Sequence, residues 1–263
     1  MPFDPNPAAA ALDAARAAGA EASLPPHIAP RDVAEGVAVQ FARATRAGAV
    51  PPAGFKIGAT TQRMQEYLRL SGPAAGYMVT AGLHRSGVRM PFAALRGPGA
   101  ECEIGVRLAR DLPAGACDAA TAGAAVGEVF AAIEIVENRY GTPPAGDLAR
   151  IGTATLIADQ VYHACAILGT PLTDWAALDL QAIPGRIAVD GMERASGHGS
   201  DLLGHPMNAL AWLVGSPTIA AFGGLHAGQV VMLGSVTPPI WLQGPCRATV
   251  DFSPLPVVRV QFV

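Results

Sequence analysis

Residues 100–106 read Ala-Glu-Cys-Glu-Ile-Gly-Val, a half-apolar segment in which Glu101 and Glu103 are separated by one residue. This pattern predicts a short β-strand, and a strand directs residues i and i+2 to the same face. The two carboxylates should therefore point to one side, about 7 Å apart along the strand. Like charges on one face repel each other unless a cation neutralises them or one of them takes up a proton.

A third acid, Glu134, lies in the apolar segment Ala-Ile-Glu-Ile-Val at residues 132–136. This segment reads as a core strand, where a carboxylate without a partner is costly. Together with Glu101 and Glu103, Glu134 suggests a site for a hard divalent cation, Mg²⁺ or Mn²⁺, with oxygen ligands. Zinc is less expected because these strands offer no histidine. A solvated strand edge is the alternative for Glu101 and Glu103, and the residues alone leave both interpretations open.

The length and composition limit the number of domains and the kinds of partner that this chain can have. The chain has 263 residues, enough for one large domain or one domain with a smaller appendage. A net charge of −3 argues against nucleic acid as the partner. Thirty Gly and 23 Pro residues favour many turns over long helices.

The cysteines, the first residues and the apolar runs of the chain indicate its cellular compartment. The four cysteines, Cys102, Cys117, Cys165 and Cys246, form no CxxC pair and no zinc spacing, so we expect reduced thiols in a cytoplasmic protein. The start, Met-Pro-Phe-Asp-Pro-Asn-Pro, lacks the basic and apolar regions of a signal peptide. No uninterrupted apolar run is long enough to cross a bilayer, so we expect no membrane partner.

The order of predicted elements indicates the architecture. Hydrophobic periodicity and Gly or Pro stops predict helices over 7–20, 31–47, 61–70, 148–168 and 206–214, and residues 119–125 are either a helix or a loop of small residues. Apolar runs predict strands over 54–58, 76–79, 129–136, 230–233, 247–252 and 257–262, with a hairpin turning at Asp190-Gly191. We therefore expect a helical N-terminal segment, residues 1–75, followed by a β-rich catalytic domain, residues 76–263.

Lys56 and a polar loop are further candidates for chemistry. Lys56 lies in the short strand Gly-Phe-Lys-Ile-Gly and could bind a substrate carboxylate or move a proton; a strand lysine that only reaches solvent is the alternative. Residues 196–201, Ser-Gly-His-Gly-Ser-Asp, predict a Gly-rich loop whose Ser196 and Gly197 could hold a substrate anion, or an ordinary turn.

Three more polar residues are candidates for the functional site, but each also has a purely structural interpretation. Asp159, inside the predicted helix 148–168, either contacts the substrate or belongs to the solvent-exposed face of that helix. His198 and His205 could act as acid or base groups, although a single loop histidine usually does not.

These segments together resemble the fumarylacetoacetate hydrolase superfamily, and more closely its branch of 2-keto-4-pentenoate hydratases and 4-oxalocrotonate decarboxylases. Residues 54–58 are similar to that branch's Gly-Trp-Lys-Ile/Val-Gly, and 100–104 to its Val-Glu-x-Glu-Ile. Residues 132–136 look like the strand that supplies its third acid, and 196–209 like its Ser-Gly-x-Gly-x-x-x-Leu-Gly-His/Asp-Pro-x-x-Ala block. Order and spacing agree across about residues 35–262.

The resemblance implies an α+β fold, a mixed β-roll with a helical N-terminal part. It implies Mg²⁺ or Mn²⁺ held by Glu101, Glu103 and Glu134, with Lys56 near the substrate as a catalytic group. It also implies a homo-oligomer acting on a small 2-oxo acid in the breakdown of aromatic compounds. The expected reaction is hydration of a 2-hydroxy-2,4-dienoate, or of its 2-oxo-enoate tautomer, to a 4-hydroxy-2-oxo acid.

Several departures from the branch pattern keep alternatives open. Residues 76–81 lack the acid expected near Ala81, which leaves the proton-transfer group undefined. Phe55 replaces the usual Trp, Gln160 stands where Asn is common, and residues 233–239 differ from the usual Thr-Gly segment. A metal-dependent decarboxylase of a 2-oxo-3-enedioate is one alternative, because loss of CO₂ from that diacid would form the same kind of metal-stabilised enolate. A catalytically weak homologue that assembles with a pathway enzyme is another.

Overall fold

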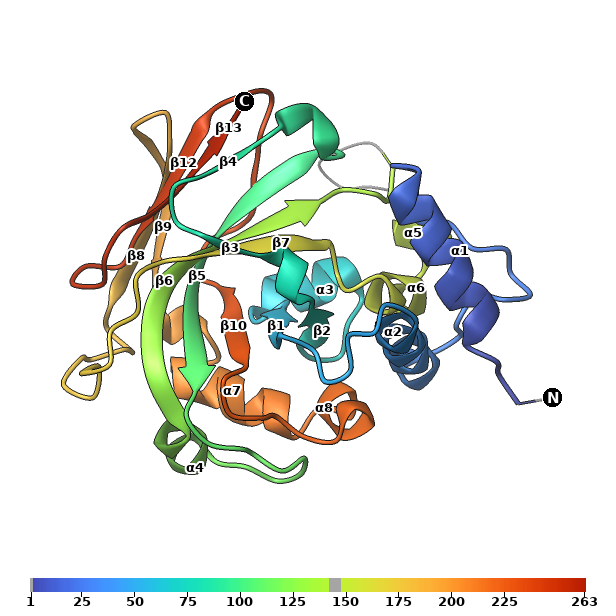
Figure 1. The fold of residues 1–263 in the computed structure, drawn as a ribbon, viewed down its shortest axis with the longest axis horizontal. Coiled ribbons are helices and arrows are strands. Elements are labelled where there is room, and N and C mark those ends of the chain that lie inside the picture. Colours follow the sequence, from blue (N-terminus) through green and yellow to red (C-terminus); the bar gives the residue numbers. More distant parts are fainter. Residues whose placement is uncertain (1, 142–147) are drawn as a thin grey trace.

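The computed structural model describes residues 2–141 and 148–263, and two sheets organise it. The larger sheet has eight strands in the order β2-β1-β10-β5-β6-β7-β3, with β11 paired to β5. Its strands are β1 Gly54–Gly58, β2 Ala74–Met78, β3 Leu83–Arg85, β5 Pro98–Leu108, β6 Val126–Glu137, β7 His163–Leu168, β10 Val230–Ser235 and β11 Ile240–Trp241. Figure 1 shows that the long strands β5 and β6 curve strongly through the molecule.

The smaller sheet has five strands in the order β4-β13-β12-β8-β9. Its strands are β4 Val88–Met90, β8 Pro184–Val189, β9 Met192–His198, β12 Arg247–Asp251 and β13 Val258–Phe262. Both sheets are mixed, because β1 and β10, β3 and β7, and β4 and β13 pair in parallel. Alternate side chains of β5 and β6 pack with this smaller sheet into the main hydrophobic core, which confirms the expected mixed roll.

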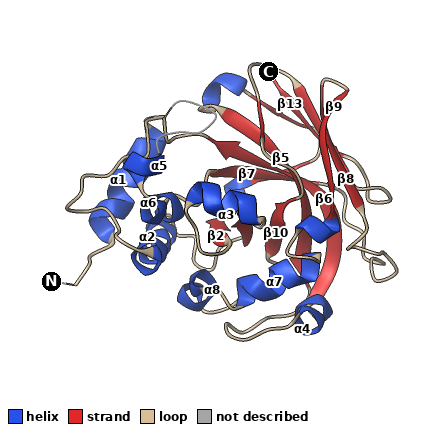
Figure 2. Ribbon diagram, turned by 180° about the vertical axis from the view of Figure 1, so that it is seen from behind, coloured by secondary structure: helices blue, strands red, loops and turns tan. Residues whose placement is uncertain are grey.

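One group of helices lies on the side of the molecule opposite the smaller sheet, and a second group packs into the main core that the two sheets share (Figures 1 and 2). The helices are α1 Asn6–Ala17, α2 Val33–Arg46, α3 Gln62–Leu68, α4 Ala119–Ala124, α5 Leu148–Ile151, α6 Thr153–Ala158, α7 Pro206–Val214 and α8 Pro217–Phe222. Short 3₁₀ turns are η1 Thr80–Gly82, η2 Phe92–Ala94 and η3 Gly199–Asp201. Among the described helices, none has the length and apolar character needed to cross a bilayer.

Most predicted elements are confirmed within a few residues. The Asp32 carboxylate accepts a hydrogen bond from the Glu35 amide and caps α2, as an N-cap residue should. Asp190 and Gly191 have φ of 52° and 80° and connect β8 to β9 as the predicted two-residue hairpin turn. Strand β1, which belongs to the predicted N-terminal segment, lies between β2 and β10 of the larger sheet. The predicted division of the chain into residues 1–75 and 76–263 stays a prediction.

The predicted long helix over residues 148–168 is wrong. The chain forms two short helices, α5 and α6, and then a left-handed turn in which Gln160, Val161 and Tyr162 have φ of 65°, 50° and 67°. It continues as strand β7. This strand has apolar neighbours on both faces, so its sequence lacks the alternation that separates a strand from a buried helix.

The predicted loop over residues 196–200 is also wrong. Strand β9 continues to His198 and is followed directly by η3. The His198 amide donates to the Asp201 carboxylate, and the Gly199 and Ser200 amides donate to backbone carbonyls. These three amides are therefore already paired within the protein.

Gly105 provides a test of how tightly β5 and β6 pack. It lies opposite Phe130, and a Cβ on Gly105 would come within 2.2 Å of the buried Phe130 ring. We expect Gly105→Ala to lower the free energy of unfolding in urea by about 1–3 kcal/mol, the usual cost of overpacking. Gly72→Ala is the matched control, because a Cβ there meets nothing within 4 Å. Equal stability of the two variants would contradict this packing.

Candidate metal centre

Two neighbouring strands bring the three predicted acids together. Glu101 of β5 lies directly opposite Glu134 of β6, and Glu103 follows two residues later on the same face. Each of the three side chains offers an oxygen, and these oxygens all lie within 4.8 Å of one another. The predicted juxtaposition is therefore confirmed, and the set has the spacing that a single cation needs.

The unsatisfied oxygens of this cluster fit a cation. Glu103 and Glu134 are fully buried, and Glu101 is partly exposed. One Glu103 oxygen, Oε2, accepts a hydrogen bond of 3.0 Å from the Gly234 amide. Glu103 Oε1 and Glu134 Oε2 have no hydrogen-bond partner among the described residues. Buried carboxylate oxygens without donors are unfavourable in the protein alone and are suitable ligands for a hard divalent ion.

Lys56 lies beside this cluster. Its side chain projects from β1, is 2% exposed, and places Nζ 3.4 Å from Glu134 Oε1. The ammonium also donates a 2.6 Å hydrogen bond to the Val161 carbonyl. That carbonyl belongs to the left-handed turn after α6, a conformation that is unusual for a β-branched residue. The strained turn therefore helps to fix the position of the Lys56 ammonium.

Sequence reasoning missed His163, which contacts the same carboxylate as Lys56. Its Nδ1 lies 2.9 Å from Glu134 Oε1, and the ring is buried. Burial lowers the pKa of His163 although the hydrogen bond to Glu134 opposes this, so the neutral ring donates its Nδ1 proton to the ionised carboxylate. Because residues 148–168 were expected to be a helix, nothing placed His163 at the start of a strand next to β6.

Gly234 is a second residue that the sequence did not reveal. Its φ of 104° favours glycine, and this conformation directs its amide to Glu103. A Cβ on Gly234 would also come within 2.5 Å of the Thr60 methyl group. Only a glycine therefore combines the turn with the close approach to β1.

Crowding separates the pKa values of the three acids. Burial, and then the charge of Glu134, raises the pKa of Glu101 to about 8. Burial and both neighbouring carboxylates raise the pKa of Glu103 well above its ordinary value. Burial would also raise the pKa of Glu134, but the charge of Lys56 and the hydrogen bond from His163 lower it to about 2. Without a cation, Glu134 therefore carries the negative charge and its neighbours retain protons.

Asp159 lies in a separate ion-pair network. It is fully buried, accepts hydrogen bonds from Arg43 at 3.0 Å and from the Tyr140 hydroxyl at 2.8 Å, and pairs with Arg139. Burial would raise the pKa of Asp159, but the arginines, first of all Arg16, lower it. The network explains the buried charge of Asp159, and its suggested contact with substrate stays a prediction.

The remaining candidates lie outside the carboxylate cluster. Ser196 and Gly197 belong to β9 of the smaller sheet, where a Cβ on Gly197 would meet the Val236 carbonyl at 2.1 Å. Their contact with substrate stays a prediction. His205 caps α7 by accepting the Met207 amide, which accounts for its polarity without acid–base chemistry.

The acid expected near Ala81 is not supplied by the neighbouring strand. Ala74 and Gly76 of β2 lie opposite Gly58 and Lys56 of β1, so β2 presents no carboxylate to the Lys56 side. Ala81 itself lies in η1 and lines a different cavity.

Comparison with known proteins decides the family. No protein-family model matches the chain. A 2-keto-4-pentenoate hydratase of Burkholderia vietnamiensis is 31% identical over 215 residues, which span 80% of this chain and 77% of that protein. A 2-hydroxyhexa-2,4-dienoate hydratase of Comamonas testosteroni is 32% identical over 70% of this chain and 68% of that protein. The chain belongs to the 2-keto-4-pentenoate hydratase family.

Solved structures show that this hydratase-family chain has the fold of the fumarylacetoacetate hydrolase superfamily. A 4-oxalocrotonate decarboxylase from Pseudomonas putida, complexed with magnesium and adipate, superposes with a TM-score of 0.87 at 21% identity, over 98% of this chain and 97% of that one. A fumarylpyruvate hydrolase from Pseudomonas aeruginosa, with Mn²⁺ and pyruvate, gives a TM-score of 0.62 at 13% identity, over 80% and 88%. The resemblance drawn from four sequence segments is thereby confirmed.

The raised pKa of Glu101 predicts how pH affects the metal-free protein. Folded Glu101 holds its proton up to about pH 8, whereas the unfolded residue loses it near its ordinary value of 4.5. The folded state therefore binds more protons in between, and stability must fall as pH rises. We expect the urea-unfolding free energy to decline from about pH 6.5 to pH 8, a window above the ordinary pKa of His163.

Glu101→Gln isolates this effect, because an amide cannot titrate. The decline should be smaller in this variant than in the wild type, and added Mg²⁺ should reduce it in the wild type by replacing the protons. Identical pH dependence in the variant and the wild type would contradict the assignment of the raised pKa to Glu101.

Proposed function

We propose that this protein is a divalent-metal-dependent lyase that adds water to a 2-hydroxy-2,4-dienoate, or to its 2-oxo-enoate tautomer, and forms a 4-hydroxy-2-oxo acid. The observation that carries the proposal is the set of three carboxylates with converging oxygens, two of which lack partners among the described residues. Relatives named as hydratases of such dienoates, about 30% identical, support the reaction class.

Glu101, Glu103 and Glu134 would hold Mg²⁺ or Mn²⁺. Both ions prefer oxygen ligands, and this set offers oxygens only. When bound, the cation would supply Lewis acidity that polarises the carboxylate and 2-oxo groups of the substrate. Magnesium and manganese in the complexes of the decarboxylase and of the fumarylpyruvate hydrolase support this choice.

Lys56 is the proposed catalytic group. Its ammonium is fixed by the Val161 carbonyl and lies next to a proposed ligand, so it can attract the substrate carboxylate and exchange a proton with the dienoate. His163 orients Glu134 by donating to Oε1, which leaves Oε2 free for the cation. Ser196, Gly197 and Asp159 are retained as proposed substrate contacts.

Decarboxylation of a 2-oxo-3-enedioate is the alternative reaction. One feature favours it, because on the Lys56 side β2 presents Ala74, Gly76 and Met78 and so offers no carboxyl group to help protonate a hydrated product. The same feature suits a weakly active homologue assembled with a pathway enzyme. We also propose a homo-oligomer, as the family resemblance implies, that acts in the cytoplasm, where the four free cysteines would stay reduced.

Turnover by the purified full-length chain tests the proposal. With Mg²⁺ or Mn²⁺, we expect loss of dienoate absorbance at roughly 1 s⁻¹ or faster, without release of CO₂. Glu103→Gln should lower metal-dependent turnover by more than about 100-fold, beyond the usual loss from removing an outer-shell partner. Glu193→Gln, on the exposed face of β9, is the matched control and should leave turnover unchanged.

The outcomes separate the three candidate functions. Release of CO₂ from a 2-oxo-3-enedioate, with no hydration of the dienoate, would replace the hydratase by the decarboxylase. Turnover that stays far below 1 s⁻¹ with both substrates would favour the weakly active homologue. Full activity of Glu103→Gln would contradict the metal centre itself.

A further inference from the structure

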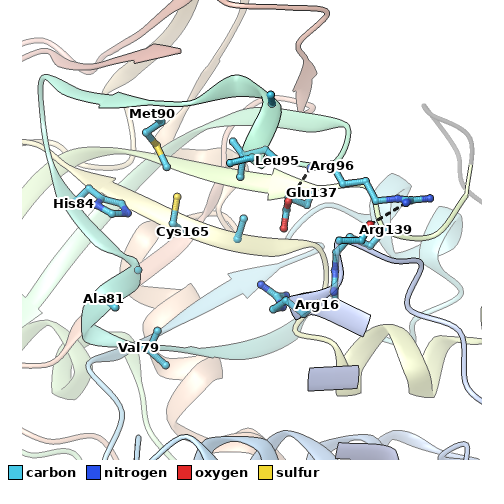
Figure 3. A pocket seen from close by; sticks show the side chains of 15 residues that line it. Arg16, Val79, Ala81, His84, Met90, Leu95, Arg96, Glu137, Arg139 and Cys165 are labelled. Carbon is cyan, nitrogen blue, oxygen red and sulfur yellow. Dashed lines mark hydrogen bonds between the residues drawn. The ribbon is translucent and has the colours of Figure 1, made fainter. Parts of the chain in front are cut away.

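A second cavity, of about 500 Å³, lies at the β3–β7 edge of the larger sheet, between that edge, η1, η2 and α1 (Figure 3). None of Glu101, Glu103 and Glu134 is among the described residues that line it. Ala164 and Cys165 of β7 line the cavity, and the next residue, Ala166, lies opposite Glu134. The cavity is therefore a neighbour of the carboxylate cluster that is lined by residues other than the three proposed ligands.

Cations dominate one end of this cavity. Arg16, Arg96 and Arg139 line it together with a single acid, Glu137, and Figure 3 shows Arg16 and Arg139 at one end and His84 at the other. Glu137 already accepts a hydrogen bond from the Arg96 amide. The polar end of the cavity therefore carries more positive than negative charge.

The network behind the cavity does not neutralise these arginines. Four arginines share two carboxylates through the ion pairs of Arg16, Arg43, Arg46 and Arg139 with Asp13 and Asp159. The Arg139 side chain is 3% exposed, and its Nη1 finds no hydrogen-bond partner in the described part of the chain. Arg16 Nε is also buried without a described partner. Buried guanidinium donors without acceptors are costly and indicate a missing anion.

The rest of the lining is apolar. Val79, Met90, Leu95 and Cys165 supply side chains that can contact a hydrocarbon chain (Figure 3). A planar guanidinium pairs well with a planar carboxylate through two parallel hydrogen bonds. The volume lies within the range of small-ligand pockets, which combine apolar walls with a few polar groups.

We propose that this cavity binds a small organic carboxylate, which pairs with Arg16 and Arg139 and lays its hydrocarbon chain on the apolar wall. The site is distinct from the proposed metal centre and requires no metal. One contact links the two, because Arg16 Nη2 donates a 3.0 Å hydrogen bond to the His163 carbonyl, and the His163 ring binds Glu134.

Butyrate is the probe, and its binding to the protein is measured by ligand-observed NMR titration. Divalent metals are first removed with a chelator, and the chelator is then removed as well. We expect butyrate to bind, and butyramide, which has the same chain without the charge, to bind at least about 10-fold more weakly. Inorganic phosphate should displace butyrate poorly, because it cannot use the apolar wall. Arg16→Met should weaken butyrate binding by at least about 10-fold, and Arg186→Met, an exposed arginine of β8, should not.

A steric variant tests the same site without removing a charge. Ala81→Trp places an indole in the cavity and should abolish butyrate binding, whereas Ala34→Trp on the exposed face of α2 should not. Butyrate binding that needs added Mg²⁺ would assign the carboxylate to the metal centre and overturn the proposal. Equal binding of butyramide, tighter binding of phosphate, or unchanged binding in both Arg16→Met and Ala81→Trp would also overturn it. Activity with a dienoate plays no part in these outcomes, so this proposal and the proposed function can fail separately.

Discussion

The crowding of three carboxylates, two of them fully buried, on one face of two paired strands is the constraint on which the rest of this structure depends. Glu101 and Glu134 lie directly opposite each other, and Glu103 and Glu134 are fully buried. Carboxylates so placed repel each other and lose hydration, so the neighbouring strands must supply compensation. Strand β1 supplies the Lys56 ammonium, β7 the His163 ring and β10 the Gly234 amide. Even so, two oxygens remain without partners among the described residues, as expected for a site that is completed by a cation.

The segment from Asp159 to His163 joins this site to the helices. Asp159 is held by Arg43 of α2, by Arg139 and by Tyr140, and the chain then passes through the left-handed turn at Val161 to His163. The Val161 carbonyl accepts from Lys56, and the His163 ring donates to Glu134. The buried arginine network therefore does more than neutralise Asp159, because it anchors the turn that positions two groups around the carboxylates. The N-terminal helices are in this way part of the support of the site.

The sequence predicted those features of the fold and the site that are encoded by neighbouring residues, and it missed those that depend on long-range strand pairing. The alternation around Glu101 and Glu103, the short strand of Lys56 and the Asp190-Gly191 turn follow from neighbouring residues, and all three are confirmed. His163 and Gly234 were missed because their roles arise from strands that pair across long stretches of chain. The helix expected through residue 168 failed because β7 is covered on both faces. The surplus of arginines around the second cavity likewise exists only in three dimensions, since those residues come from α1, from the segment between η2 and β5, and from the segment just after β6.

Anomalous diffraction from crystals of the full-length protein soaked in Mn²⁺ tests the central claim most directly. The expected result is one strong peak bound by oxygens of Glu101, Glu103 and Glu134 at about 2.0–2.3 Å, with Lys56 still donating to the Val161 carbonyl. A cluster that stays free of manganese at saturating concentration, or a peak held by other side chains, would contradict it. In that case protonation, together with Lys56 and His163, would have to account for the buried acids.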